Sequence, residues 1–353
     1  MPNLFDPAML GDIALSNRVV MAPMTRSRAG QGDVPTDLHV AYYRQRASAG
    51  LIITEGTQPS ANGKGYCRTP GIHDAAQIEA WKSVTDAVHG AGGRIVMQIM
   101  HVGRVASQLN TAEGTESVAP SAIRAAGQIF TEQGMVDFDE PRALDIAEIP
   151  GVIAEFAEAT RNALAAGCDG VELHCTSGYL PAQFLSSNSN QRTDAYGGSA
   201  QNRIRFVVEA LTAMAAVAGP GRVGFRICPG NPFNDIHDAD PVETYGALLE
   251  AVAPMGLAYL HLIDVPNPQL DSLALVRERW TGNLILNRDE MPAEVAQELV
   301  QTGGATAISF GRRFIANPDF VERLLSGAAL NAIDFNTLYT PGAEGFTDYS
   351  ALA

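Results

Sequence analysis

The residues best suited to chemistry in this 353-residue sequence lie within or just beyond short apolar runs. They are Thr25, Gln98, His174, Ser177, Tyr179, Arg226 and Arg312. Cationic and amide donors together with a phenol suit an anionic aromatic cofactor and a carbonyl substrate, because such groups stabilise negative charge and can deliver a proton. The set therefore favours a cofactor-dependent site over hydrolysis.

Two other common chemistries lack their usual signatures. The seven histidines form no H-E-x-x-H pattern, and His174 has no evident ligand partner nearby, so we expect no metal at the site. A G-x-S-x-G elbow for a serine nucleophile is absent. The four cysteines form no C-x-x-C pair, which favours reduced thiols.

Eight short apolar runs must position these side chains, and eight helix-like stretches alternate with them. The predicted strands are 18–24, 51–55, 94–100, 170–174, 223–227, 258–264, 283–286 and 306–310. The predicted helices are 37–49, 75–90, 153–166, 200–218, 241–255, 270–280, 291–302 and 318–326. This alternation predicts an α/β protein, a single-domain (β/α)₈ TIM barrel over residues 1–353. A doubly wound open sheet is the alternative, weakened by the lack of a G-x-G-x-x-G after any strand.

One segment interrupts the alternation. Residues 105–150, after the third strand, are too long for an ordinary strand-to-helix connection and are rich in Gly, Ala, Ser and Glu. We expect this insertion to form a cap or lid over the mouth of the barrel.

The charge of the chain restricts its partners. Acidic residues outnumber basic ones by 39 to 24, for a net charge of −15, which disfavours nucleic acid and anionic membranes and leaves a small molecule as the expected partner. No apolar run reaches the roughly 18 residues of a spanning helix, and residues 1–11 lack a signal-peptide pattern. We therefore expect a cytoplasmic protein.

A phosphate site is expected after the last strand. Barrels commonly bind phosphate after strands seven and eight, and Gly311-Arg312-Arg313 occupies that place. Position alone supports equally the alternative that Arg312 is a surface salt-bridge residue.

Three longer motifs carry a family resemblance. They are MAPMTR at 21–26, HCTSGYLPAQFLSSNSNQRTDAYGG at 174–198 and FGRRFIANPD at 310–319. With matching residues from Leu4 to Tyr349, the chain resembles the old yellow enzyme family. The resemblance implies a barrel that binds FMN, takes hydride from NAD(P)H and passes it to the β-carbon of an activated alkene, such as an enone, enal, maleimide or nitroalkene.

The resemblance also assigns cofactor contacts. It places Thr25 near the reactive edge of the flavin, Gln98 at the pyrimidine ring, Arg226 near N1 and the C2 carbonyl, and Arg312 at the phosphate. Further implied contacts are Pro23, Met24, Gly56, Asn287, Arg288 and Gly311. An alternative stays open for three of these residues. Thr25 would be a β-branched strand residue whose hydroxyl bonds its own backbone, and Gln98 would be a buried amide bonded to neighbouring strands. Arg226 would form an ion pair with a barrel carboxylate.

Two residues are implied to act on the substrate. His174 would donate a hydrogen bond to the substrate oxygen, and Tyr179 would deliver a proton to the α-carbon. The competing interpretations are a satisfied core histidine and a packing tyrosine. Tyr66 is expected in the substrate pocket.

The sequence departs from the family pattern at several positions. Ser177 stands where members usually have Asn or a second His, and Asn287-Arg288 replaces a glycine-rich turn. Met100 and Phe346 stand where Trp and Tyr are frequent, so both are expected to reshape the substrate pocket. A serine hydroxyl has a shorter reach than an amide, so Ser177 is expected to loosen the clamp on the substrate oxygen.

Four functions are therefore compared. The leading one is an FMN-dependent, NAD(P)H-consuming ene-reductase. Ser177 and the altered turn motivate a flavin-dependent desaturase or isomerase of a specific metabolite. The remaining alternatives are a flavin-binding protein with little catalysis and a metal-free barrel lyase. For quaternary structure we expect a monomer or a homodimer.

Overall fold

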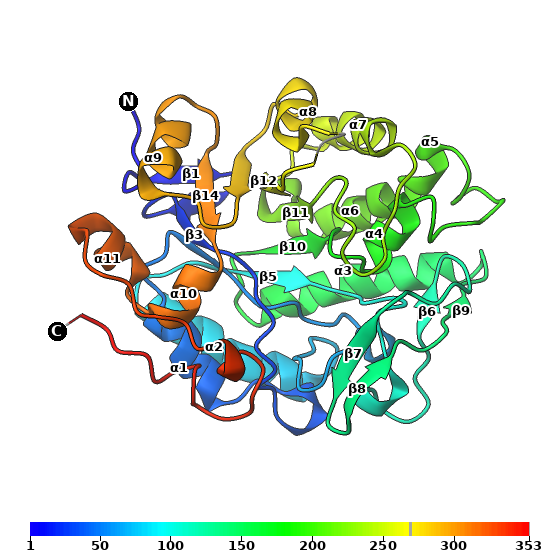
Figure 1. Cartoon of the computed structure of the whole chain (residues 1–353), viewed down its shortest axis with the longest axis horizontal. Coiled ribbons are helices and arrows are strands. Elements are labelled where there is room, and N and C mark those ends of the chain that lie inside the picture. Colours follow the sequence, from blue (N-terminus) through cyan, green and yellow to red (C-terminus); the bar gives the residue numbers. More distant parts are fainter. Residues whose placement is uncertain (268–269, 353) are drawn as a thin grey trace.

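The computed structural model describes residues 1–267 and 270–352. In this part of the chain, eight parallel strands form a closed barrel with helices around it, which confirms the (β/α)₈ prediction (Figure 1). In barrel order the strands are β3 (Val19–Met21), β4 (Leu51–Ile53), β5 (Ile95–Ile99), β10 (Gly170–His174), β11 (Val223–Ile227), β12 (Tyr259–Ile263), β13 (Leu284–Asn287) and β14 (Ala307–Phe310).

These segments become strands because their continuous apolar sequence is covered on both faces. Every residue of β10 and of β11 is buried, as expected for parallel strands packed between a filled interior and a layer of helices. Parallel pairing sets His174 opposite Arg226 and Glu172 opposite Gln98. Polar side chains predicted from separate runs are thus brought to neighbouring positions.

The helices follow the predicted alternation with some differences in extent. The main ones are α1 (Asp37–Gln45), α2 (Ala75–Gly90), α3 (Ile149–Ala165), α6 (Arg205–Ala218), α7 (Pro241–Val252), α8 (Ser272–Arg279), α9 (Ala293–Gln301) and α11 (Phe320–Ser326). The predicted helix 200–218 is divided at Ile204 into α5 (Ala200–Arg203) and α6. Two short helices, α4 (Leu180–Leu185) and α10 (Arg312–Ala316), follow β10 and β14 directly and were not predicted.

A hairpin that the sequence did not predict closes the amino end of the barrel. Its strands, β1 (Ala8–Leu10) and β2 (Ile13–Leu15), bury Leu10, Ile13 and Leu15 against interior residues of the barrel strands. The turn uses Gly11 at φ +57°, where a β-carbon would lie 2.4 Å from the carbonyl oxygen of Gly221. With this end plugged, the open mouth lies at the carboxyl ends of the strands.

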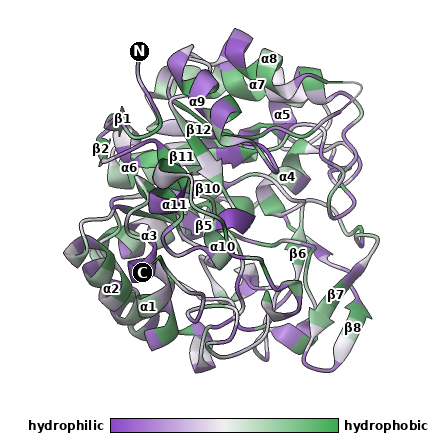
Figure 2. Cartoon of the chain, turned by 60° about the vertical axis from the view of Figure 1, so that its left-hand side comes forward, coloured by the Kyte–Doolittle hydropathy of each residue, from purple (hydrophilic) through white to green (hydrophobic). Residues whose placement is uncertain are grey.

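The insertion after β5 forms four short strands. They are β6 (Val118–Ala119), β7 (Gln128–Thr131), β8 (Gly134–Asp137) and β9 (Arg142–Ala143), with β7 and β8 paired as an antiparallel hairpin. Figure 2 shows this hairpin projecting beside the barrel, with hydrophobic and hydrophilic residues on its strands. Ile129 and Phe138 pack with Met100 and Tyr179 in a separate hydrophobic cluster, so the insertion is anchored next to the mouth.

Two buried arginines hold the C-terminal segment against the same end of the barrel. Arg26 donates to the carbonyl oxygens of Leu338 and Gly345, and Arg28 donates to five carbonyl or hydroxyl oxygens of residues 337–344. Because each bond reaches a backbone or hydroxyl oxygen in one short segment, the arrangement fixes the path of that segment past the mouth.

Glu55 is buried beneath these arginines and faces His39 at 3.6 Å. Burial raises the pKa of Glu55 to about 7 and lowers the pKa of His39 to about 4, so between these values neither group is charged and the contact is no ion pair. Thr36 donates its backbone N–H to Nδ1 of His39, which fixes the proton on Nε2.

The raised pKa of Glu55 makes stability fall with pH. Its stabilising contribution is complete below pH 4.5, the ordinary carboxyl pKa, and is lost as pH rises through about 7, by about 3 kcal/mol in total. Glu55→Gln should remove this dependence. The free energy of unfolding of the variant should therefore rise relative to that of the wild type as pH rises from 5 to 8. Urea unfolding across that range measures the difference. A constant difference between the two proteins would contradict the assignment.

Two general features complete the fold. All four cysteines are buried free thiols. None of the helices in the described ranges is long and apolar enough to cross a membrane.

Candidate active site

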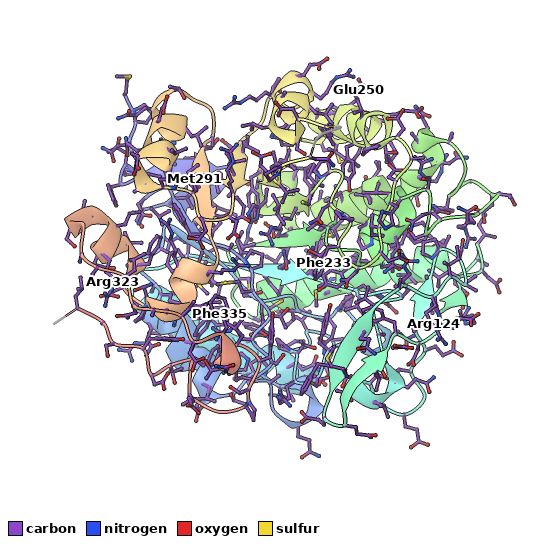
Figure 3. All side chains as sticks on the ribbon, in the orientation of Figure 1. Arg124, Phe233, Glu250, Met291, Arg323 and Phe335 are labelled. Carbon is purple, nitrogen blue, oxygen red and sulfur yellow. The ribbon has the colours of Figure 1, made fainter. Side chains whose placement is uncertain are left out.

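A cavity of about 680 Å³ lies at the carboxyl ends of the barrel strands. The predicted site residues that line it are Pro23, Met24, Thr25, Tyr66, Tyr179, Arg226, Asn287, Arg288, Gly311 and Arg312. They lie near the carboxyl end of strands β3, β10, β11, β13 and β14 or in the loop after β4, so the barrel brings together residues up to about 290 positions apart in sequence. Met291, Phe233 and Phe335, which are labelled in Figure 3, also line the cavity and come from three different segments of the chain.

His174 and Tyr179 meet edge to face at the end of β10. Their ring centroids are 4.9 Å apart with an interplanar angle of 86°. Tyr179 reaches this position because it is the N-cap residue of α4, and its backbone N–H donates to the carbonyl oxygen of Thr176 in the preceding turn. The predicted pair is therefore placed together, with the phenol directed into the cavity.

The protonation of the pair suits donation. Burial is the main cause that raises the pKa of Tyr179 well above its ordinary value, so the phenol keeps its proton, and its O–H donates to the hydroxyl of Tyr66 at 3.1 Å. Burial, followed by the charge of Arg226, lowers the pKa of His174 well below its ordinary value. His174 is neutral at pH 7, and among the described residues its Nδ1 has no hydrogen-bond partner.

Ser177 occupies a backbone conformation that favours asparagine. Its φ is +58°, in the left-handed region that Asn adopts more readily than most residues. Its N–H donates to the hydroxyl of Thr176, and its carbonyl oxygen accepts from the side chain of Asn234. The turn is thus held by backbone and neighbouring groups, independently of the serine hydroxyl.

Replacing Ser177 by Asn should therefore fit the turn and supply an amide donor beside His174. If the substrate oxygen binds there, we expect reduction of an enone to accelerate, by up to about 10²-fold, since one well-placed donor has that effect. Ser177→Asp is the matched control, because Asp tolerates the same backbone conformation but its carboxylate cannot donate. Steady-state kinetics distinguish the two variants, and equal rates for both would exclude a donor role at this position.

Arg226 is buried in β11 and lines the cavity. Its Nη2 donates to Oδ1 of Asn287 at 3.3 Å, whereas Nε has no partner within the described ranges. Burial lowers the pKa of Arg226, and the charge of Glu172 partly offsets this effect. An unpaired donor on a buried cation is costly, so the site suits an anionic or carbonyl-rich ligand.

The predicted phosphate residues are paired with carboxylates. Arg288 forms an ion pair with Asp264, and Arg312 bonds Asp289 at 3.0 Å. More than half of the Arg312 side chain is exposed. Arg312 thus forms the surface salt bridge that was the alternative to a phosphate site. Both arginines nevertheless line the cavity, where they could also bind a phosphate.

Six predicted residues lie outside the cavity lining. They are Gly56, Gln98, Met100, His174, Ser177 and Phe346. Gly56 packs on Met100, whose sulfur would lie 2.4 Å from an added β-carbon. Phe346 is fully buried and stacks on Tyr42 with ring centroids 4.1 Å apart. Gln98 donates from Nε2 to Glu172 at 2.7 Å.

Sequence reasoning missed the rim of the cavity. Phe233 and Asn234 follow β11, while Phe335, Leu338 and Tyr339 come from the C-terminal segment. Phe335 and Tyr339 are more than half exposed. Exposed aromatic residues close to glycine and proline were the available signal, but without the fold no pattern showed that these loops share one mouth.

A plugged barrel with this cavity and its unpaired buried donors is the architecture of a barrel enzyme that binds a large polar cofactor. Within residues 1–267 and 270–352, no three His, Cys, Asp or Glu side chains are grouped as metal ligands.

The comparisons with known proteins agree with this class. The chain matches the NADH:flavin oxidoreductase / NADH oxidase family over residues 3–331. A probable flavin mononucleotide-dependent alkene reductase of Leishmania infantum is 41% identical, with 98% of this chain and 96% of that protein covered. The structure of morphinone reductase in complex with tetrahydroNAD gives a TM-score of 0.94 at 44% identity, covering 100% of this chain and 98% of that one. The old yellow enzyme homologue from Zymomonas mobilis gives 0.96 at 38% identity, covering 99% and 100%.

The chain therefore belongs to this flavin oxidoreductase family, the old yellow enzymes, as its motifs predicted. It is an NAD(P)H-dependent oxidoreductase whose cofactor is FMN.

Proposed function

We propose that this protein is an ene-reductase that uses FMN and NAD(P)H to saturate the carbon–carbon double bond of an activated alkene. The observation that supports this proposal most strongly is the contact between neutral His174 and protonated Tyr179 at the mouth of a barrel that binds FMN. One group can hold the substrate oxygen, and the other can provide the proton that the reduction consumes.

The residues of the cavity fit the cofactor. The unpaired Nε of Arg226 provides a donor for a ring carbonyl, and Thr25 and Met24 line the same cavity from the end of β3. Asn287, Gly311 and the two paired arginines, Arg288 and Arg312, would bind the phosphate end. When bound, FMN accepts hydride from NAD(P)H and supplies it to the β-carbon of the alkene.

His174 and Tyr179 then act on the substrate directly. A neutral imidazole N–H of His174 donates to the carbonyl or nitro oxygen, which draws electron density from the double bond. Tyr179 transfers its phenolic proton to the α-carbon. Burial holds the Tyr179 proton firmly in the resting site, so transfer requires the negative charge that develops on the substrate.

The cap and the aromatic rim fit a substrate with a sizeable apolar part. Ile129 and Phe130 of the insertion and Phe233, Phe335 and Tyr339 line one cavity. We therefore propose that residues 105–150 serve as a cap, and that the substrate's apolar part packs against it. The net charge of −15 and the buried free thiols favour a cytoplasmic enzyme. We propose that it acts as a monomer or homodimer.

The second candidate is a desaturase or isomerase that makes no net use of NAD(P)H. It is favoured by Ser177, whose short hydroxyl offers weaker polarisation of the substrate oxygen than an amide. Product analysis in air and in the absence of NAD(P)H separates the candidates. An isomerase needs no electron acceptor and a desaturase can pass its two electrons through the flavin to oxygen, whereas the ene-reductase yields no product without a hydride donor.

The decisive experiment is an anaerobic titration followed by visible absorbance. NADPH should bleach the flavin band of the purified yellow protein, and cyclohexenone should restore it with formation of cyclohexanone. If the band bleaches and stays bleached with cyclohexenone, maleimide and a nitroalkene, the ene-reductase proposal is wrong while the flavin assignment stands.

A further inference from the structure

A chain of buried polar side chains crosses the interior of the barrel below the cavity. Glu172 of β10 accepts from Nε2 of Gln98 on β5 at 2.7 Å, and its other oxygen lies 2.9 Å from Nδ1 of His261 on β12. Nε2 of His261 lies 2.8 Å from the hydroxyl of Ser309 on β14. All four residues are at most 2% exposed, so these bonds lie away from bulk solvent.

The hydrogen bonds define the protonation of the chain. Burial, followed by the charge of Arg226, lowers the pKa of His261, which is therefore neutral at pH 7. Both oxygens of Glu172 face nitrogen atoms, so the bonds are satisfied when Glu172 is a carboxylate and His261 carries its proton on Nδ1. Nε2 of His261 then accepts the Ser309 hydroxyl proton.

The order of residues on β10 places Glu172, the centre of this hydrogen-bonded row of side chains, one layer below His174. Glu172 and His174 are two residues apart on β10, so their side chains point to the same side of the strand, with Glu172 farther from the mouth. Arg226 pairs in register with both His174 and His261. Glu172 forms no direct ion pair with Arg226, whose Nη2 bonds Asn287, but its negative charge raises the pKa of Arg226 against the effect of burial and so partly balances the buried positive charge.

The bond to Glu172 also orients the Gln98 amide. An amide held by one N–H keeps a second N–H and a carbonyl oxygen, which is the donor and acceptor pair that matches the adjacent carbonyl and N–H of a flavin pyrimidine edge. Without Glu172 the amide could rotate by half a turn and exchange its donor and acceptor.

We propose that Glu172 is a positioning residue for the flavin: it fixes the Gln98 amide in its binding orientation and, as the counter-charge of Arg226, keeps the reduction potential lower than Arg226 alone would set it. This proposal rests on the flavin chemistry proposed above. It does not depend on which alkene is reduced.

The test compares three holoenzyme variants at pH 6 in two measurements, the reduction potential from an anaerobic dye titration and the rate of FMN release on dilution. Glu172→Gln removes the charge in an almost unchanged shape, and Glu172→Asp keeps the charge with a shorter reach. Glu55→Gln is the matched control, since Glu55 is equally buried, lies outside the chain and is mostly protonated at this pH.

Glu172→Gln should favour reduced over oxidised cofactor by about tenfold, an upward shift of about 30 mV for a two-electron couple. FMN release should be about tenfold faster, because the Gln98 amide loses its fixed partner. Glu172→Asp should leave the potential near the wild-type value and still release FMN faster. Glu55→Gln should change neither quantity.

Wild-type potential and release in Glu172→Gln would overturn the proposal, and so would an equal shift in Glu55→Gln, which would indicate a general packing effect. If Glu172→Gln does not fold, Ser309→Ala tests the opposite end of the row of hydrogen bonds. FMN release should then be about threefold faster at an unchanged reduction potential, and an unchanged rate of FMN release would contradict the proposal. Neither measurement involves an alkene, so a failure of the ene-reductase proposal would be seen separately, as a yellow protein that no alkene reoxidises.

Discussion

Tyr179→Phe is expected to slow the reoxidation of the NADPH-reduced enzyme by cyclohexenone by about 10²- to 10⁴-fold, the usual contribution of a positioned general acid. The phenol of Tyr179 is buried, keeps its proton and lies against His174. Phenylalanine preserves the ring contact and removes only the acid. Reduction of the flavin by NADPH should change by less than a factor of about three, because that step consumes no proton from the protein.

Tyr66→Phe is the matched control for this experiment. The hydroxyl of Tyr66 accepts the hydrogen bond of Tyr179, so its removal disturbs the orientation of the acid but leaves the acid in place. We expect a loss of a few-fold in the reoxidation rate. Stopped-flow absorbance with each variant separates the two half-reactions. Similar losses for Tyr66→Phe and Tyr179→Phe would identify the pair as packing, and unchanged reoxidation in Tyr179→Phe would exclude it as the proton donor.

The barrel could be predicted because its signal is local and repeated. Continuous apolar runs such as those of β10 and β11 indicate strands covered on both faces, and their alternation with amphipathic stretches restricts the topology to few choices. The β1 and β2 hairpin escaped prediction because its strands have three residues each and become meaningful only when they plug the barrel. Short elements owe their structure to tertiary contacts that no sequence pattern records.

The position of a site residue could be predicted where the residue lies on a strand. His174 and Arg226 end up opposite each other because both lie on adjacent parallel strands that the apolar runs had already located. Phe346 shows the limit: the family resemblance suggested the substrate pocket, because Phe346 stands where tyrosine is frequent, but the structure packs it on Tyr42 beneath Arg26 and Arg28. Loops and chain ends have no periodic pattern, so their place relative to the mouth becomes evident only from the folded chain.

The neighbours of the buried polar residues Arg226 and Gln98 could not be predicted from the sequence either. An ion pair with a barrel carboxylate was the alternative for Arg226, and bonds to a neighbouring strand were the alternative for Gln98. The structure gives both residues one neighbour, Glu172, which no motif had singled out. The alternatives and the proposed cofactor contacts are therefore compatible, because the Gln98 amide can bond a buried carboxylate with one group and a ligand with the others, and Arg226 is near that carboxylate without bonding it.

The second large effect is expected for Arg226→Met, which should weaken FMN binding by about 10²-fold or more and lower the reduction potential. Loss of one partner of a buried charge pair costs about 2–5 kcal/mol, and each 1.4 kcal/mol corresponds to a factor of ten in affinity. The unpaired Nε of Arg226 loses its ligand, and the cavity loses the positive charge that stabilises the electron-rich reduced ring.

Comparison of FMN with riboflavin separates the role of Arg226 from that of the phosphate arginines. Under the proposed placement of Arg226 at the ring, Arg226→Met should weaken both ligands equally, whereas Arg312→Met should weaken FMN and leave riboflavin unchanged. The variant Arg226→Met also leaves the buried charge of Glu172 without a nearby positive charge, so Arg226→Met combined with Glu172→Gln should recover part of the lost thermal stability and part of the lowered potential. If Arg226→Met retains wild-type affinity for riboflavin, Arg226 does not contact the ring, and its burial in β11 serves the barrel alone.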